Sequence, residues 1–218
     1  YACKEAGIPA TGIIRGEEPA NWSATLQAAA AAGMQLRFLP RSEYTRLNQT
    51  LVSDEHTCVI PAGGYGTKGM EGAATIADLF DPHLYTHICC AAGTGTMAAG
   101  LATRLQANQT LAVIPVLRHT GIEQDIRRLC GPTACKLVVL PDFHGGGYAK
   151  ISDDLLAFMN DWYRQTGIAT DFVYTGKLFR AVVQLKDDGF FPAGSRILVV
   201  HSGGLQGNAS LPKGSLIF

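Results

Sequence analysis

Residues 87–101 read HICCAAGTGTMAAGL, an apolar run that breaks into Gly-Thr-Gly-Thr and resumes with small residues. This order predicts a strand, a tight turn and a helix start, an arrangement in which unpaired backbone N–H groups point at an anion such as phosphate. The spacing differs from the common nucleotide fingerprints, because Ala98 replaces the last glycine of G-x-G-x-x-G and no Gly-Lys-Ser/Thr follows. The alternative is a plain strand-to-helix connection that needs glycine for positive φ.

Two tyrosines also lie in polar, glycine-bounded segments, Tyr148 in GGGYAK and Tyr174 in TDFVYTGK. A phenol in such a loop can reach into a pocket and orient or deprotonate a substrate. The alternative is a ring packed under a loop with its hydroxyl in water. Thr175, the next residue, has a structural alternative as the N-cap of the helix that follows.

Ser202 in HSGG follows an apolar run, so its hydroxyl could bind a ligand at the end of that strand. A hydrolase is not indicated, because the chain has no GxSxG elbow and His201 would point the opposite way on a strand. The six histidines lack HxH or HExxH spacing and the six cysteines lack a CxxC pair, so we expect no metal site.

Composition narrows the class of partner. Lys plus Arg and Asp plus Glu are both 18, so bulk charge gives no reason to expect nucleic acid or an anionic membrane as a partner. No apolar run approaches the length of a membrane span, and the N-terminus has no signal pattern. With the cysteines interpreted as reduced thiols, we expect a soluble, cytoplasmic protein that binds small molecules.

Most of the candidate residues follow predicted strands, and predicted strands alternate with predicted helices almost throughout the chain. We expect strands within 10–19, 34–40, 58–64, 87–92, 111–117, 136–141 and 196–204, and helices within 24–32, 43–52, 69–80, 96–105, 121–131, 152–167 and 176–189. This pattern predicts an α/β fold with parallel sheet covered on both faces, whose ligand sites lie at the carboxyl ends of strands. Glycine-rich or polar loops at 61–69, 91–96, 142–150 and 201–208 mark four such ends.

The motifs taken in order resemble a known family. RGEEP, IPAGG with EGA, AAGTGT with AAGL, VYTGK and HSGGLQGN follow one another as in the 1-aminocyclopropane-1-carboxylate deaminase and D-cysteine desulfhydrase family, over nearly the whole chain. The resemblance implies an α/β, fold type II pyridoxal-phosphate enzyme, similar to the tryptophan synthase β subunit, with two parallel-sheet domains. By analogy, residues 1–60 belong to a smaller domain that closes over the substrate and 61–218 to a larger domain that binds pyridoxal 5'-phosphate. Homodimers are usual in the family.

The resemblance also implies roles for individual residues. The cofactor phosphate would bind Gly93, Thr94, Gly95 and Thr96; Tyr148 and Tyr174 would flank the substrate as catalytic groups; Ser202 would face the pyridine nitrogen and Thr175 would lie beside the cofactor. The family's Schiff-base lysine and substrate loop lie upstream of the segment that matches YACKEAG, so we expect the N-terminal part of the enzyme to be missing from this sequence. Lys68 is the only local substitute, and it matches a loop without that role.

The implied reaction is a lyase reaction on a small amino acid. In the family, ring-opening deaminases typically carry Glu after the VY tyrosine and desulfhydrase-like members carry Thr, as here at Thr175. This favours D-cysteine, converted to pyruvate, sulfide and ammonia, over 1-aminocyclopropane-1-carboxylate, converted to 2-oxobutanoate and ammonia. Other amino-acid lyases of the same fold are alternatives, and the alternative of another class is a non-catalytic module that binds a phosphate ligand.

Overall fold

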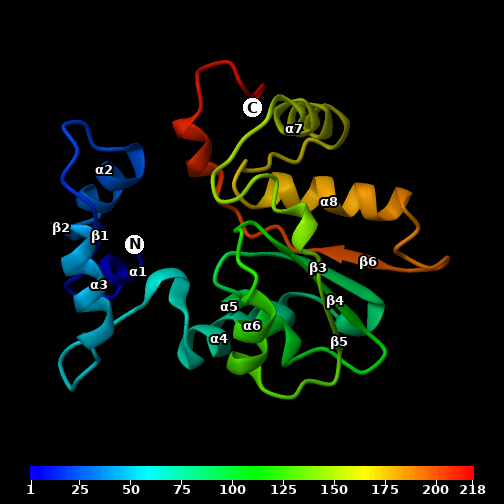
Figure 1. Cartoon of the computed structure of the whole chain (residues 1–218), viewed down its shortest axis with the longest axis horizontal. Helices are drawn as coiled ribbons and strands as arrows, with labels where there is room; N and C mark the ends of the chain where they lie inside the picture. The colour runs from blue at the N-terminus through cyan, green and yellow to red at the C-terminus, as the bar shows by residue number, and fades with distance from the viewer. The chain divides into compact units, whose positions relative to one another are not determined.

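The computed structural model describes all 218 residues and divides them into two compact units, Tyr1–Ile60 and Pro61–Phe218 (Figure 1). None of the helices combines the length and apolar character that crossing a bilayer requires.

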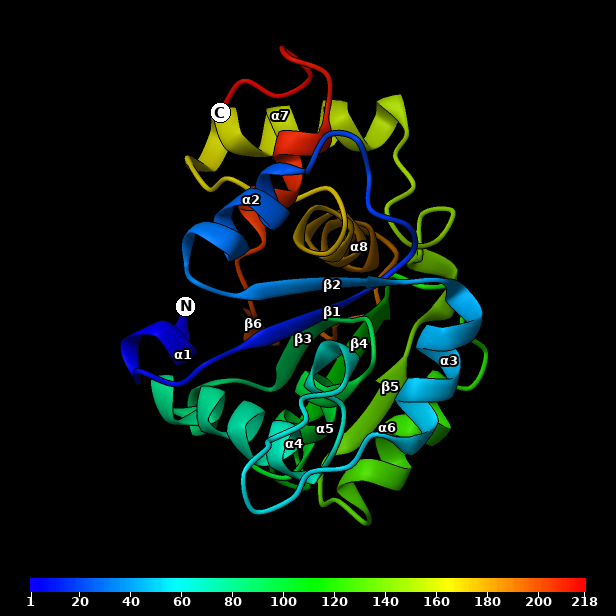
Figure 2. The ribbon, with the colours of Figure 1, turned by 90° about the vertical axis from the view of Figure 1, so that its left-hand side faces the viewer.

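The first unit is a small βαβ arrangement. Its elements are α1 (Ala2–Glu5), β1 (Thr11–Arg15), α2 (Ala24–Ala31), β2 (Gln35–Leu39) and α3 (Arg41–Thr50). Strands β1 and β2 pair in parallel, with Thr11 opposite Gln35, and lie side by side in Figure 2. The alanine-rich helix α2 begins where the Ser23 hydroxyl accepts a hydrogen bond from the Leu26 N–H at 3.3 Å.

The second unit contains the larger sheet. Its elements are α4 (Thr67–Ala74), β3 (His87–Ala92), α5 (Thr96–Ala102), β4 (Thr110–Pro115), α6 (Ile122–Cys130), β5 (Lys136–Val139), α7 (Asp153–Thr166), α8 (Thr175–Asp187) and β6 (Ile197–Val199). The strands are parallel in the order β5-β4-β3-β6. Their carboxyl ends therefore meet at one edge of the sheet, with β3 in an interior position.

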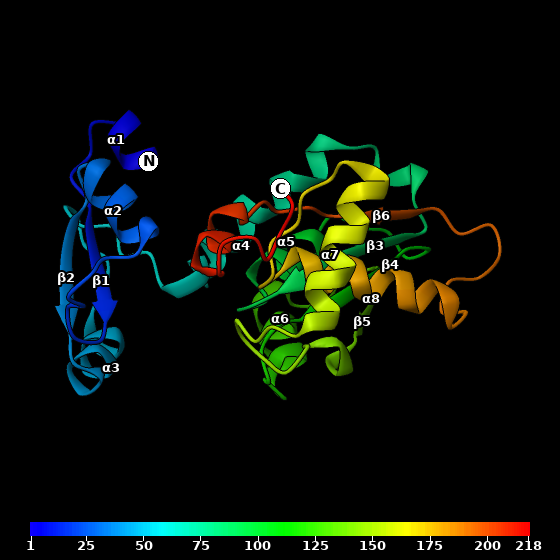
Figure 3. The same cartoon turned by 90° about the horizontal axis from the view of Figure 1, so that it is seen from above.

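Helices cover both faces of this sheet (Figure 1). Side chains alternate along β3: Ile88 and Cys90 pack with residues of α5 and α6, whereas Cys89 and Ala91 pack with residues of α8. Helix α7 packs on α8, as the view in Figure 3 shows. Burial is so complete in β3 that it raises the pKa of the Cys89 thiol to about 12. The loop that follows β3 is thus anchored in the best-packed part of the unit.

Helices α4 and α5 approach each other at Gly100. A Cβ atom on Gly100 would lie 2.6 Å from the Met70 carbonyl oxygen and 2.7 Å from the Ala74 nitrogen. The backbones meet directly at this point, so only glycine fits there.

Two expected elements differ in the structure. The prediction of a strand within 58–64 is wrong, because this segment forms no strand and ends in a 3-10 turn, Ala62–Gly64. Pro61 cannot donate to a strand ladder, and Gly63 and Gly64 have φ of +64° and +63°. The helix expected within 69–80 begins earlier, at Thr67, and tightens into a 3-10 helix over Thr75–Leu79.

His87, the first residue of β3, is expected to make stability depend on pH. The His87 ring lies against Phe190 and Phe191, with centroids 6.3 and 5.2 Å away, and burial followed by the charge of Lys136 lowers its pKa. Between that lowered pKa and the ordinary value of about 6.5, the unfolded chain binds more protons. We therefore expect the contribution of His87 to be present above about pH 6.5 and lost as the pH falls below it.

Urea unfolding at about pH 7.5 and about pH 5.0 measures this loss. His87→Gln should lose less stability on acidification than the wild type, and His83→Gln, which changes an exposed histidine, should behave as the wild type does. Equal acid sensitivity of His87→Gln and the wild type would show that the ring is not responsible.

Candidate functional site

The loop after β3 presents unpaired backbone donors. Gly93, Thr94 and Gly95 connect β3 to α5, with Gly95 in the left-handed region at φ +83°. No protein acceptor lies within hydrogen-bond distance of the backbone N–H groups of residues 93–96. The Thr94 and Thr96 hydroxyls lie 2.9 Å apart. The loop therefore has free donors to offer to an anion.

Neighbouring segments hold the loop in this shape. A Cβ atom on Gly63 would lie 2.6 Å from the Thr94 side chain, and the Thr94 hydroxyl lies 3.4 Å from the Gly63 carbonyl oxygen. On the other side, a Cβ atom on Gly95 would lie 2.6 Å from Ile126 Cγ1 of α6. The glycines thus allow segments 61–69 and α6 to pack directly against the loop.

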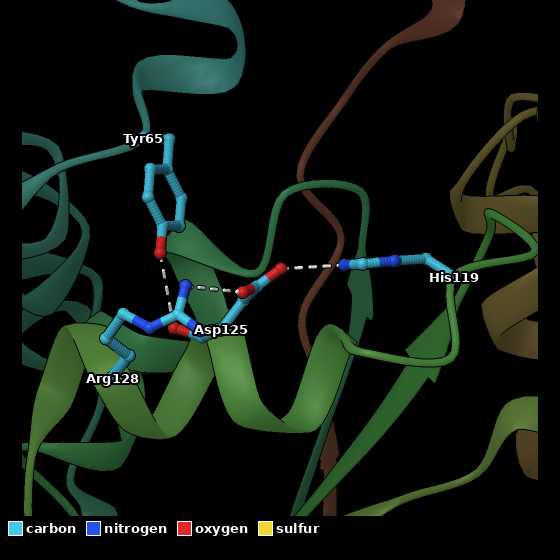
Figure 4. Close-up of polar contacts among 4 residues, drawn as sticks. All are labelled: Tyr65, His119, Asp125 and Arg128. Atoms are coloured by element: carbon cyan, nitrogen blue, oxygen red, sulfur yellow. Dashed lines mark hydrogen bonds and ion pairs between the residues drawn. The ribbon is translucent and has the colours of Figure 1, made fainter.

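A cavity of about 320 Å³ opens against this loop. Its lining residues are Tyr65, Gly93, Thr94, Leu117, His119, Asp125 and Arg128. Within it, the Asp125 carboxylate lies 2.7 Å from His119 Nε2 and 3.1 Å from Arg128 Nη1 (Figure 4). The Tyr65 hydroxyl points at the Asp125 carbonyl oxygen at 3.5 Å (Figure 4). A cavity that contains the His119–Asp125–Arg128 group therefore shares a wall with the start of the loop, Gly93 and Thr94.

Tyr174 contacts the same loop. A Cβ atom on Gly93 would lie 3.1 Å from the Tyr174 hydroxyl oxygen, so the phenol reaches the glycine backbone. Burial, and then the neighbouring Tyr148, raise the pKa of Tyr174 to about 12. Tyr174 therefore stays protonated at neutral pH and can act there as a hydrogen-bond donor, while its phenolate is strongly disfavoured.

Tyr148 is beside Tyr174. The two rings meet edge to face, with centroids 6.3 Å apart and an interplanar angle of 74°. Tyr148 is 57% exposed, so most of its ring is open to a ligand. The structure thus brings together two phenols that lie 26 residues apart in the chain.

Ser202 follows β6, whose parallel pairing with β3 puts both loops at the same edge of the sheet. Ser202 is exposed and its hydroxyl has no protein partner within hydrogen-bond distance. The His201 ring anchors the segment, with Nε2 2.8 Å from the Ala169 carbonyl oxygen and Nδ1 accepting from the Gly203 N–H at 3.2 Å. The serine hydroxyl is thus free for a ligand while its neighbour is fixed.

Thr175 does not have the free hydroxyl that a cofactor ligand needs. Its side chain is fully buried, donates to Asp171 Oδ1 at 2.8 Å and accepts from the Asp171 N–H at 2.7 Å. Because Asp171 occupies this hydroxyl, the contacts of Thr175 argue against the predicted cofactor contact. Thr175 is also not the N-cap of α8, since the helix begins at Thr175 itself.

Asp171 is the residue that organises this helix start. Its carboxylate accepts hydrogen bonds from the N–H groups of Val173, Tyr174 and Thr175, at 2.7 to 2.9 Å, although the side chain is 1% exposed. Sequence reasoning missed this role. The available signal was an aspartate four residues before the helix start, a residue type that favours helix N-termini.

Three other placements had no signal in the sequence. Asn208 bonds both the Thr170 carbonyl oxygen and the Phe172 N–H, at 3.0 and 3.2 Å, and so joins the segment before Tyr174 to the segment after Ser202. His119 and Asp125 meet in the cavity without any motif in their spacing. Lys68, expected in a loop at a strand end, instead lies exposed in helix α4.

Comparison with known families and proteins gives consistent matches. A family described as pyridoxal-phosphate dependent enzyme matches residues 1–203. A Pyrococcus horikoshii protein, provisionally named a 1-aminocyclopropane-1-carboxylate deaminase, is 26% identical over 228 aligned positions that cover 94% of this chain and 69% of that protein. The 1-aminocyclopropane-1-carboxylate deaminase of Mesorhizobium japonicum is 32% identical over 103 residues, which cover 47% of this chain and 30% of that enzyme.

Solved structures share the fold. The crystal structure of an ACC deaminase homologue superposes with a TM-score of 0.71 at 24% identity, covering 95% of this chain and 69% of the other. The processed form of threonine deaminase isoform 2 from Solanum lycopersicum gives a TM-score of 0.56 at 14% identity, covering 93% and 61%. At these identities the likeness establishes the fold, and the predicted fold type II architecture is confirmed.

Proposed function

The chain belongs to the family of pyridoxal-phosphate dependent enzymes, and from this premise we propose that it functions in a lyase acting on a small amino acid. The observation that carries the proposal is the loop 93–96, whose backbone N–H groups have no protein acceptor and whose first two residues line a cavity that contains His119, Asp125 and Arg128. These residues fit the phosphate group of pyridoxal 5'-phosphate, because backbone donors in a glycine turn bind phosphate oxygens without a bulky side chain in the way. When bound, this cofactor withdraws electrons from the α-carbon of an amino acid.

Three side chains of this chain would orient the cofactor and the substrate. Tyr174, protonated at neutral pH, donates a hydrogen bond beside Gly93 and orients the bound molecule. Tyr148, which is exposed, contacts the substrate from the adjacent loop. Ser202 supplies a neutral hydroxyl to the pyridine nitrogen and so places no fixed charge there. By analogy with the family, the unit Tyr1–Ile60 closes over the substrate, the unit Pro61–Phe218 holds the cofactor, and the enzyme is a cytoplasmic homodimer.

A change at Gly95 tests the phosphate site. An alanine would be strained at φ +83° and its Cβ would press on Ile126, so Gly95→Ala should displace the loop donors. We expect the wild-type enzyme to bind pyridoxal phosphate more tightly than pyridoxal, and Gly95→Ala to reduce this preference by about tenfold, or about 1.4 kcal/mol. Cofactor fluorescence titrations with both compounds measure the ratio of affinities.

Circular dichroism of the same variant provides the folding control. Thr94→Val keeps the backbone donors and removes one hydroxyl, so its affinity ratio should change by only about twofold to fourfold. A wild-type ratio in well-folded Gly95→Ala would rule out these N–H groups as the phosphate ligands.

For the substrate, we propose D-cysteine or a related D-amino acid with a β-leaving group. Loss of sulfide from D-cysteine, followed by addition of water, gives pyruvate and ammonia, so the atoms balance. The support is Thr175, a neutral residue where ring-opening deaminases typically carry Glu. Because the Thr175 hydroxyl is bonded to Asp171, this support now rests on the absence of Glu and not on a contact of Thr175 itself.

Ring opening of 1-aminocyclopropane-1-carboxylate is the second candidate, and the names of the similar proteins favour it. One assay separates the candidates. The complete enzyme is given each substrate, and sulfide with pyruvate is compared with 2-oxobutanoate. A higher kcat/KM for the cyclopropane substrate would overturn the choice of D-cysteine.

A further inference from the structure

Lys177 is a buried cation on the third residue of α8. Its side chain is 3% exposed, and burial lowers the pKa of its ammonium group. Removing an ammonium from water is costly unless hydrogen bonds replace its hydration. Those bonds come from two backbone carbonyl oxygens, of His144 at 3.0 Å and Gly147 at 2.6 Å.

The two carbonyl groups are the first and last of one tight turn. The Gly147 N–H donates to the His144 carbonyl oxygen at 3.2 Å, and the Gly146 N–H donates to His144 Nδ1 at 2.9 Å. Gly145, Gly146 and Gly147 all have positive φ, at +59°, +88° and +114°. Successive glycines of this kind have many alternative conformations, so a bridge between the two carbonyls restricts the segment strongly.

Tyr148 follows this turn directly. Its ring meets the ring of Tyr174, and Tyr174 immediately precedes α8, the helix that carries Lys177. One helix therefore fixes both phenols, one through the chain and the other through the ammonium. A Cβ atom on Gly145 would lie 3.2 Å from Lys177 Cε, so the lysine stem also packs against the turn.

We propose that Lys177 is a positioning residue, which holds the turn His144–Gly147 so that Tyr148 stays beside Tyr174 on the substrate side of the site. The inference rests on the proposed function, because it takes the two tyrosines to face the substrate. Fold stability alone does not require the charge, since an apolar side chain of similar length would fill the space without the cost of desolvation. The ammonium is needed where two carbonyl oxygens must be held at a fixed separation.

A double-mutant cycle in the complete enzyme tests the proposal. We expect Lys177→Met to lower kcat/KM by about tenfold when Tyr148 is present and by less than about twofold in the Tyr148→Phe background, because a residue that acts through Tyr148 has nothing left to position. Lys186→Met, at the exposed end of the same helix, is the matched control and should leave kcat/KM unchanged. An undiminished loss in the Tyr148→Phe background would overturn the proposal.

A spectroscopic readout separates this inference from the proposed function. With 3-fluorotyrosine incorporated, the ¹⁹F signal assigned through Tyr148→Phe should shift and sharpen in Lys177→Met as the turn becomes mobile, and should be unchanged in Lys186→Met. An unchanged signal in Lys177→Met would refute the positioning role even if activity fell. If the wild-type enzyme lacked lyase activity, the proposed function would fail, and this signal would still decide whether Lys177 fixes Tyr148.

Gly145→Ala is the second variant, for use if Lys177→Met does not fold. It disturbs the contact of the turn with the lysine stem from the exposed side of the loop. It should move the same ¹⁹F signal and lose its effect on kcat/KM in the Tyr148→Phe background. An unaltered Tyr148 signal in a folded Gly145→Ala protein would contradict the proposal.

Discussion

Replacing Asp171 with alanine is expected to lower the free energy of unfolding by about 3 to 5 kcal/mol, because several buried N–H and O–H donors would lose their acceptor together. The carboxylate accepts bonds from three consecutive N–H groups and from the Thr175 hydroxyl, in a place with almost no access to water. Alanine would leave these donors unsatisfied, at about 1 to 3 kcal/mol each before relaxation. The start of α8, and with it Tyr174, would lose its anchor.

Urea unfolding monitored by circular dichroism measures the change. Asp187→Ala, at the exposed end of the same helix, is the matched control and should change stability by less than about 0.5 kcal/mol. Asp171→Asn keeps one acceptor oxygen and should fall between the wild type and Asp171→Ala. A loss below about 1 kcal/mol in Asp171→Ala would show that water replaces the carboxylate.

The second large effect is expected at Gly100. A methyl group there would lie 2.6 to 2.8 Å from three backbone atoms of α4, and backbone atoms cannot turn aside as a flexible side chain can. Helices α4 and α5 would have to separate, so Gly100→Ala should destabilise the protein by about 3 kcal/mol, the upper end of the range for overpacked cores. Because α5 begins at the 93–96 loop, the preference for pyridoxal phosphate over pyridoxal should fall as well.

Gly72→Ala is the matched control for this substitution. Gly72 lies on the exposed side of α4, and apart from the adjacent backbone of the helix itself no atom lies within 4 Å of the place that an alanine methyl group would take. Alanine should therefore stabilise the helix by about 0.5 to 1 kcal/mol. In the same urea experiment, Gly100→Ala should therefore lower the free energy of unfolding and Gly72→Ala should raise it, although the two helices pack against each other. If both substitutions changed the free energy of unfolding in the same direction, the close approach of the two backbones at Gly100 would not be what determines the effect of Gly100→Ala.

The larger sheet could be predicted well from the sequence because its signals are local. Apolar runs such as 111–117 and glycines such as Gly131 mark strands and helix ends without reference to distant residues. Segment 58–64 misled the prediction because its apolar residues resemble a strand, yet Pro61 and the two glycines leave no backbone that can pair.

The candidate site was less accessible to sequence reasoning. The loop 93–96 could be proposed as an anion site because a glycine turn between strand and helix is contiguous in the chain. The contacts of Lys177 with His144, and of His119 with Asp125, depend on how loops from different strands meet, and no periodicity encodes that. Thr175 shows the converse, since this residue, predicted to lie beside the cofactor, has its hydroxyl bonded to Asp171, a residue that the motif did not include.

Strand β6 and Ser202, which belongs to the candidate site, are synthesised late, because they lie near the end of the chain. The strand joins the edge of β3 through Arg196, which bonds Thr86 across 110 residues of chain. While the chain is being made, β3 has an open, apolar edge until Ile197–Val199 has left the ribosome, and such an edge is prone to pair with other chains. Ser202 arrives with the same strand. A nascent or proteolysed chain that ends before Arg196 would therefore lack Ser202 of the candidate site and expose an apolar sheet edge that is prone to aggregation.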